Sequence, residues 1–216
     1  MGQVHGAMAA LPHIKREGRE ALIHISSMGA KRSVPLQSAY CASKHGMEGF
    51  LEALRVELRR EGPPIGVTSI QPATTNTPFF DKARTKLGVK PVAPPPIYGP
   101  NLVADAILYA AEHPARDIVV GGAAKALILG QRLSPRLVDS LMQTRGFEVH
   151  YTDEPKAEDA PDNLYASLGH EAVEGSFSDR AHPRSLYTWL ELRPAAKGAA
   201  VAGAALGALA LLRARS

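Results

Sequence analysis

Residues 21–44 read ALIHISSMGAKRSVPLQSAYCASK, and this stretch decides the fold. Its first six residues, Ala21–Ser26, are a short apolar run rich in isoleucine, which predicts a buried strand. A long helical pattern follows, in which Tyr40 and Lys44 stand four residues apart and therefore share one helix face. Ser27 stands at the end of the strand, so we expect a strand end to face a helix that carries a phenol and an ammonium group.

These three side chains suit chemistry at a carbonyl or alcohol oxygen. A free phenol titrates near pH 10, and a nearby ammonium group favours the phenolate and lowers that pKa. Tyr40 could then exchange a proton with the substrate oxygen, while the Ser27 hydroxyl holds the same oxygen by a hydrogen bond. The pair Tyr40 and Lys44 alone is a weak motif, since a packed tyrosine beside a solvated lysine also explains it.

The string Ser38-Ala39-Tyr40-Cys41-Ala42-Ser43-Lys44, with Ser27 upstream, resembles the active-site signature of the short-chain dehydrogenase/reductase family. The resemblance extends over about residues 1–122. It implies that Ser27, Tyr40 and Lys44 are catalytic. By this resemblance Tyr40 is the general acid or base, Lys44 lowers its pKa and bonds the nicotinamide ribose, and Ser27 orients the substrate.

The remaining pattern alternates helices and strands, which predicts parallel strands joined by right-handed crossovers. We expect an α/β fold with a partial Rossmann-like parallel sheet of about three strands, flanked by helices and followed by a C-terminal extension. The expected helices are 2–16, 39–60 and 101–113, and the expected strands after the first are 65–71 and 117–121. Residues 1–125 would be the Rossmann-type domain, 126–192 an extension of helix and irregular structure, and 193–216 a tail helix.

The turn Pro72-Ala73-Thr74-Thr75-Asn76-Thr77 follows the second strand. The resemblance implies that this turn holds the nicotinamide carboxamide, with Pro72, Thr75 and Thr77 joining Tyr40 and Lys44 as cofactor-binding residues. Ala73 stands where the family usually has glycine, and an ordinary strand-to-loop turn is the alternative. The implied cofactor is NAD or NADP, which the sequence does not distinguish, and the implied substrate is a small alcohol or ketone.

A dinucleotide-binding fold begins with a strand, a glycine-rich turn and a helix that holds the pyrophosphate. No such turn precedes Ala21 in this sequence. The resemblance therefore suggests the C-terminal portion of such an enzyme, truncated before the nucleotide-binding half, and we expect doubtful activity and weak cofactor binding for these residues alone. The alternative is a non-catalytic fragment that serves as an interaction or membrane-associated module.

Residues 78–100 contain many prolines, which predicts irregular structure, and long loops of this kind are often active-site lids. The resemblance implies that this segment covers the substrate. Residues 127–142 show helical apolar spacing. Residues 198–212 (GAAVAGAALGALALL) are uncharged and apolar, so they predict a weak membrane anchor or an alanine-rich packing helix. Gly46 and Gly49 suggest close approach of another backbone to the helix 39–60. The resemblance implies that this helix and the helix 2–16 join subunits of a homo-oligomer, and packing within the subunit is the alternative.

The composition sets limits on partners and setting. The net charge is +4 and the basic residues are scattered, which argues against a nucleic-acid-binding surface. A single cysteine excludes an internal disulfide bond and suits a reducing, cytoplasmic setting. The eight histidines show no metal-ligand spacing, so we expect no metal site.

Overall fold

The computed structural model describes residues 1–17, 21–62, 64–169 and 171–213. Three parallel strands form the central sheet in the order β1-β2-β5. They are β1 (Ala21–Ile25), β2 (Gly66–Pro72) and β5 (Asp117–Val120), and each is a short run that the apolar pattern predicted. The expected α/β class with a partial parallel sheet is therefore confirmed.

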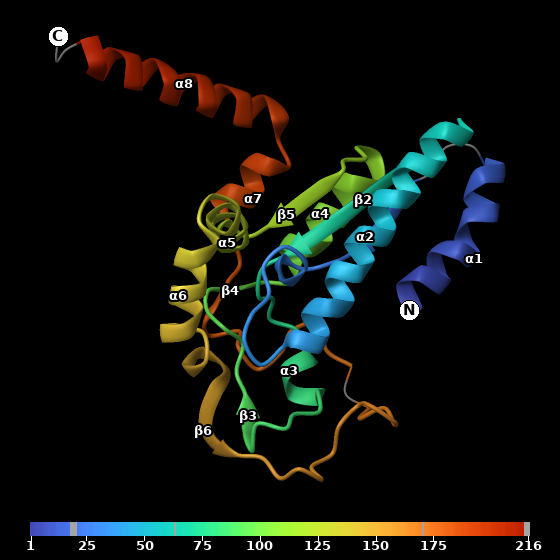
Figure 1. The fold of residues 1–216 in the computed structure, drawn as a ribbon, viewed down its shortest axis with the longest axis vertical. Coiled ribbons are helices and arrows are strands. Elements are labelled where there is room, and N and C mark those ends of the chain that lie inside the picture. Colours follow the sequence, from blue (N-terminus) through green and yellow to red (C-terminus); the bar gives the residue numbers. More distant parts are fainter. Residues whose placement is uncertain (18–20, 63, 170, 214–216) are drawn as a thin grey trace.

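Helices cover both faces of this sheet (Figure 1). On one face, α1 (Gly2–Glu17) and α2 (Ser38–Glu61) bury Leu11, Leu51 and Val67 in a common cluster. On the other face, α4 (Asn101–Glu112) packs against β2 and β5 in a second cluster. Because side chains alternate between the faces of a strand, β2 contributes Val67 to the first cluster and Ile70 to the second.

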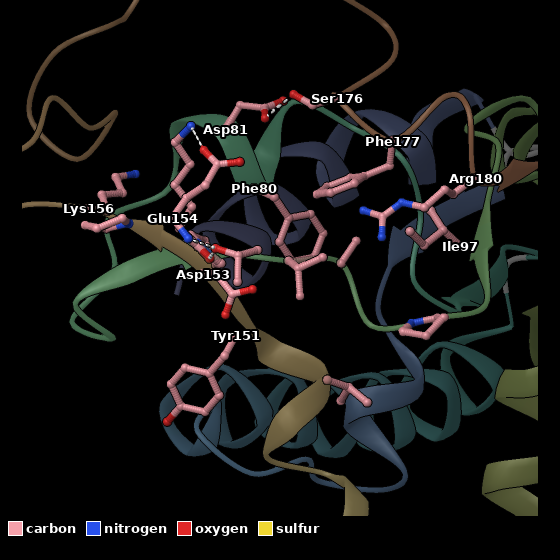
Figure 2. A pocket seen from close by; sticks show the side chains of 18 of the residues that line it. Phe80, Asp81, Ile97, Tyr151, Asp153, Glu154, Lys156, Ser176, Phe177 and Arg180 are labelled. Carbon is pink, nitrogen blue, oxygen red and sulfur yellow. Dashed lines mark hydrogen bonds and ion pairs between the residues drawn. The ribbon is translucent and has the colours of Figure 1, made fainter.

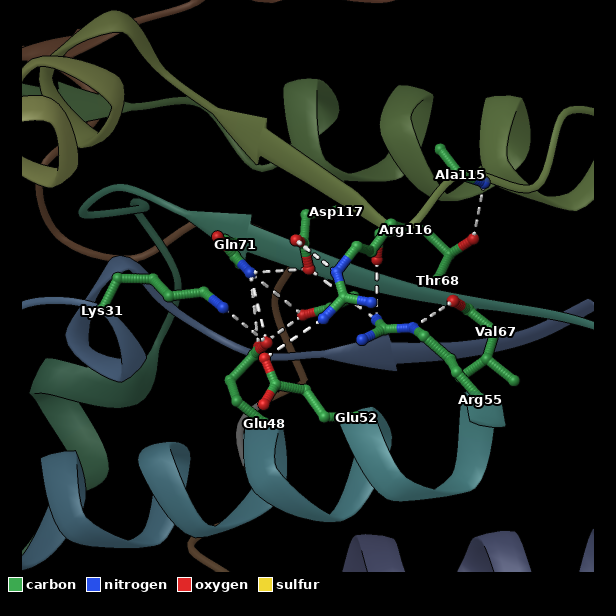
Figure 3. Close-up of polar contacts among 11 residues, drawn as sticks. Lys31, Glu48, Glu52, Arg55, Val67, Thr68, Gln71, Ala115, Arg116 and Asp117 are labelled. Atoms are coloured by element: carbon green, nitrogen blue, oxygen red, sulfur yellow. Dashed lines mark hydrogen bonds and ion pairs between the residues drawn. The ribbon is translucent and has the colours of Figure 1, made fainter. Parts of the chain in front are cut away.

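A buried polar layer joins α2 to the sheet (Figure 3). Ser69 on β2 donates to Glu48 Oε1 at 2.5 Å, and Lys31 Nζ donates to Glu48 Oε2 at 3.0 Å. Arg55 Nε donates to the Val67 carbonyl at 3.0 Å, and its Nη2 donates to the Arg116 carbonyl at 2.7 Å. Glu48 and Arg55 thus give α2 a fixed register on β2, because a buried charge is tolerated only where such partners exist.

The proline-rich segment is more regular than the sequence predicts. It contains α3 (Phe79–Lys82), β3 (Val89–Pro91) and β4 (Ile97–Tyr98). β3 pairs antiparallel with β6 (Tyr151–Pro155), and β4 pairs parallel with β7 (Ala181–His182). The expectation of a wholly irregular lid is therefore wrong, since short strands at a sheet edge accept prolines when their partners come from distant parts of the chain.

The C-terminal part packs on the end of the sheet and then leaves it. The region 127–142 forms two helices, α5 (Gly122–Leu133) and α6 (Pro135–Arg145), which meet at Ser134 because Pro135 begins a new helix. The 3₁₀ helix η2 (Glu148–His150) leads into β6, and α7 (Leu186–Glu191) packs against β5. The last helix, α8 (Pro194–Arg213), extends away from the sheet (Figure 1).

Two expectations about contacting surfaces can be compared with the structure. A Cβ atom at Gly46 or Gly49 would meet no atom of the described residues within 4 Å, so no other backbone in this part of the chain approaches them, and approach by a second subunit stays a prediction. The tail 198–212 is helical, which both a membrane anchor and an alanine-rich packing helix require. Among the residues that the structure describes, no helix is both long and apolar enough to cross a membrane.

Candidate active site

Ser27 lies just beyond the carboxyl end of β1. Its extended backbone (φ −166°, ψ 158°) caps the short 3₁₀ helix η1 (Met28–Ala30), and its Oγ accepts the Gly29 N–H at 3.0 Å. Because this bond uses the oxygen as an acceptor, the hydroxyl proton remains available for donation. The cap therefore orients Ser27 without consuming its O–H group.

Tyr40 lies in the first turn of α2 and converges on Ser27. A Cβ atom at Gly29 would lie 3.3 Å from both Ser27 Oγ and Tyr40 Cε1, so the absence of a side chain at this position lets the two approach. Tyr40 is 39% exposed, which leaves the ring accessible from outside. Gly29 was missed by the reasoning from sequence, although its place in Ser-Ser-Met-Gly was a usable signal for a close approach.

The pKa of the Tyr40 phenol is raised, mainly by burial, and Cys41 raises it further. A side-chain hydrogen bond with Ser27 acts in the opposite direction and favours the phenolate. That Lys44 lowers this pKa stays a prediction. The phenol consequently carries its proton at neutral pH.

Lys44 lies one turn further along α2. Its Nζ is 5.7 Å from the centroid of the Tyr40 ring and donates to the Ile25 carbonyl at 2.9 Å, which holds the amine at the end of β1. Burial lowers the pKa of Lys44, and the carboxylate of Glu48 opposes that shift. The structure thus brings Ser27, Tyr40 and Lys44 together at one end of one strand.

The turn 72–77 lies at the same edge of the sheet. Ile25 of β1 pairs with Ile70 of β2. Two residues beyond this pair the first strand reaches Ser27 and the second reaches Pro72, so both residues lie at the carboxyl end of the sheet. The Thr75 hydroxyl donates to the Ala73 carbonyl at 3.0 Å. Within the described ranges, the Thr75 N–H has no hydrogen-bond acceptor. The carboxyl ends of parallel strands are where α/β sheets bind ligands, so the turn and the three side chains share the expected edge.

A segment from the C-terminal part clamps this turn. Residues 174–178, here called the strap, cross Asn76, whose side chain is fully buried. The Asn76 amide donates to Ser178 Oγ at 3.0 Å, and its Oδ1 accepts the Phe177 N–H at 3.1 Å. On the other side, the Asn76 N–H donates to the Tyr98 carbonyl at 2.8 Å. No local sequence pattern pointed to Asn76, because its partners are about 100 residues away.

In residues 1–17, 21–62, 64–169 and 171–213, no group of three or more His, Cys, Asp or Glu side chains could hold a metal ion. What the site offers is a protonated phenol, a hydroxyl donor and an amine at the end of a parallel sheet. Such a set can move one proton and bind one oxygen atom.

Residues 1–88 match the family model described as short chain dehydrogenase. The oxidoreductase YxnA of Bacillus subtilis (strain 168), which is described as uncharacterized, is 35% identical over 204 residues. That alignment covers 94% of this chain and 57% of YxnA. The uncharacterized oxidoreductase YbbO of Escherichia coli (strain K12) is 33% identical over 144 residues, which cover 63% of this chain and 53% of YbbO. The chain therefore spans about half the length of the curated relatives that it matches.

A solved short chain dehydrogenase from Burkholderia cenocepacia J2315, in complex with NADP, has a similar fold. The TM-score is 0.52 at 23% identity, and the match covers 65% of this chain and 54% of the other. This likeness supports the Rossmann-like arrangement of the sheet and helices.

Proposed function

We propose that this chain belongs to the short-chain dehydrogenase/reductase family and carries the catalytic side chains of an NAD(P)-dependent oxidoreductase. The substrate class is a small alcohol or ketone. The observation that carries the proposal is the convergence of Ser27 and Tyr40 around Gly29, with Lys44 held at the end of the same strand. The family match over residues 1–88 and the two relatives named oxidoreductases support it.

The residues at this edge fit the nicotinamide end of NAD or NADP. The Thr75 N–H lacks an acceptor in the described part of the chain and suits a carboxamide oxygen. Lys44 suits the ribose hydroxyls, since its amine lies beside the Tyr40 ring and is already directed at a strand end. Pro72 and Thr77 frame the turn on either side of Thr75.

The nicotinamide ring of such a cofactor supplies or accepts a hydride. In the reducing direction, the Tyr40 phenol gives its proton to the substrate oxygen as the carbonyl carbon becomes an alcohol carbon. Because the pKa of Tyr40 is raised, the phenol is protonated before the reaction begins, so the proton is in place to be given. When a substrate is bound, Ser27 donates its O–H to the same oxygen in place of the Tyr40 phenol and holds that oxygen beside the phenol.

The test is Tyr40→Phe, with Tyr109→Phe on α4 as the matched control. In a chain that also carries a nucleotide-binding half, we expect Tyr40→Phe to lower kcat for NAD(P)H-dependent ketone reduction by about 10²–10⁴-fold, the usual contribution of general acid catalysis. Cofactor affinity, measured by nicotinamide fluorescence, should change little, since the ring and its neighbours remain. Equal activity in the two variants would refute the role of Tyr40.

A second role, as a contact surface for another macromolecule, is favoured by α8. The described side chains of this helix are almost all exposed, including Val201 (64%) and Leu206 (68%). The two roles make different predictions for Tyr40→Phe. An oxidoreductase role predicts that this variant loses turnover, whereas a contact role alone predicts that the variant behaves as the unmodified protein in every assay.

A further inference from the structure

A cavity of about 1440 Å³ lies between the lid segment and the C-terminal part, separate from the candidate active site (Figure 2). Its walls come from α3, β3 and the chain up to Ile97 on one side, and from residues 149–161 and 176–182 on the other. Ser27, Tyr40, Lys44 and the turn 72–77 do not line it. The cavity is large enough for a ligand of cofactor or fatty-acid size.

One wall of the cavity is apolar and aromatic. Phe80 and Phe177 meet edge to face, with ring centroids 5.8 Å apart. Phe177 also packs with Ala93 and Ile97 in a small buried cluster. The strap fixes this wall, since the Phe177 N–H is bonded to Asn76. A hydrocarbon chain or ring bound here would leave water and contact apolar side chains. Because these side chains are already ordered, binding would cost little conformational entropy.

The charged groups around the cavity are mostly engaged. Lys90 forms an ion pair with Glu154, and Lys156 donates to the Ala83 carbonyl. Arg180 differs from them. Its guanidinium lies 5.1 Å from the centroid of the Phe177 ring and has no anionic partner in the described ranges. A planar group of five donors, placed over an aromatic wall, is suited to a carboxylate.

The acidic groups indicate how such a ligand would be oriented. The Asp81 carboxylate accepts a hydrogen bond from Ser176. Asp153 lies on the other side of Phe80 from Arg180 (Figure 2). If an anionic head group bound Arg180, Phe80 would therefore separate it from the Asp153 carboxylate. The apolar body of the same ligand would then lie on the aromatic wall.

We propose that this cavity binds an amphipathic carboxylate, with its head group on Arg180 and its apolar body on Phe80 and Phe177. This assignment does not depend on the proposed oxidoreductase activity. It rests on the cavity, the aromatic wall and the unpaired guanidinium beside that wall.

Calorimetric titration with decanoate, kept below its micellar concentration, tests the proposal, and decan-1-ol serves as the neutral probe with the same chain. We expect one saturable decanoate site. Arg180→Gln should weaken decanoate about tenfold, as the loss of a charge-assisted hydrogen bond does, and should leave decan-1-ol unchanged. Arg184→Gln, an exposed arginine four residues away, is the matched control and should change neither titration.

Phe80→Ala addresses the apolar wall and should weaken both probes, with thermal melting as the check on folding. Three results would overturn the proposal. They are the absence of saturable decanoate binding, equal effects of Arg180→Gln and Arg184→Gln, and decanoate affinity no greater than that of decan-1-ol in the unmodified protein. If Phe80→Ala fails to fold, the comparison of Arg180→Gln with Arg184→Gln alone decides whether the proposal stands.

Discussion

Glu48 is a carboxylate that the structure buries between α2 and β2, only 5% exposed. Burial raises the pKa of Glu48, but hydrogen bonds, of which the one from Ser69 has the largest effect, together with the charge of Lys31 outweigh that effect, and the net shift is downward. A depressed pKa in the folded state means that the ionised form stabilises the fold. This contribution is present above the pKa of an unfolded glutamate and is lost as the pH falls through the folded pKa.

Glu48→Gln should therefore lower the free energy of unfolding by about 2 kcal/mol near pH 7, the range for hydrogen bonds to charged groups. The difference from the unmodified protein should shrink as the pH is lowered below about 4, where the carboxylate is protonated in the unfolded chain. Urea denaturation at several pH values measures both effects. Glu52→Gln, on the same helix but half exposed in its pair with Arg116, should cost little at any pH. A cost that stays constant down to pH 3 would contradict this account.

The sequence predicted that Ser27, Tyr40 and Lys44 would lie together, but it did not predict the direction in which the pKa of Tyr40 is shifted. Helical spacing alone placed Tyr40 and Lys44 on one face, and the structure confirms this. The pKa of Tyr40 depends on how deeply the ring is buried, and no sequence pattern measures burial at one position. The same limit explains why the role of Gly29 was not predicted, since that role is visible only once Ser27 and Tyr40 are seen close to it.

Among the elements, the strap is what ties the C-terminal part to the turn 72–77. Gly175 is packed so closely that a Cβ atom there would lie 2.4 Å from the Thr77 carbonyl oxygen. Asn76 bonds the strap through both ends of its amide. The turn is therefore held between Tyr98 and the strap, and its geometry depends on residues that lie far from it in the sequence.

Asn76→Ala should destabilise the fold by about 2–3 kcal/mol, because it removes two hydrogen bonds and leaves the Phe177 N–H buried without an acceptor. Hydrogen exchange should show faster amide exchange across 174–178 and in the turn. Ser178→Ala removes only one of the two bonds and should cost about half as much. Equal, small effects of both variants would mean that the strap is not fixed by Asn76.

Elements with a strong local pattern were predicted correctly, and elements defined by distant partners were not. The runs 21–26, 65–71 and 117–121 carry apolar patterns of their own, and each is a strand within a residue or two. β3 and β4 are too short to show a pattern, and they exist because β6 and β7 lie beside them. Contacts of this kind cannot be inferred from the composition of a proline-rich segment.

At the scale of the whole molecule, the C-terminal residues form two groups, those that pack on the sheet and those that extend away from it. Thr188 on α7 is almost completely buried, and its hydroxyl accepts the Gly121 N–H at 2.9 Å, at the end of β5. α7 therefore packs on the end of the sheet. α8 is joined to that body through α7 and through the ion pair of Lys197 with Glu191, and its exposed residues touch little else.

This contrast predicts opposite effects for two changes. Deleting residues 194–216 should lower the Tm by no more than about 2 °C, because the exposed side chains of α8 bury little surface on the body. Thr188→Val keeps the shape of a buried side chain but leaves the Gly121 N–H without an acceptor, so it should cost about 1–3 kcal/mol and lower the Tm by about 3–8 °C. Calorimetry on the two variants and the unmodified protein, over a series of protein concentrations, measures both. A large loss of Tm on deletion that shrinks as the protein is diluted would instead mean that α8 packs against a second copy of the chain in solution.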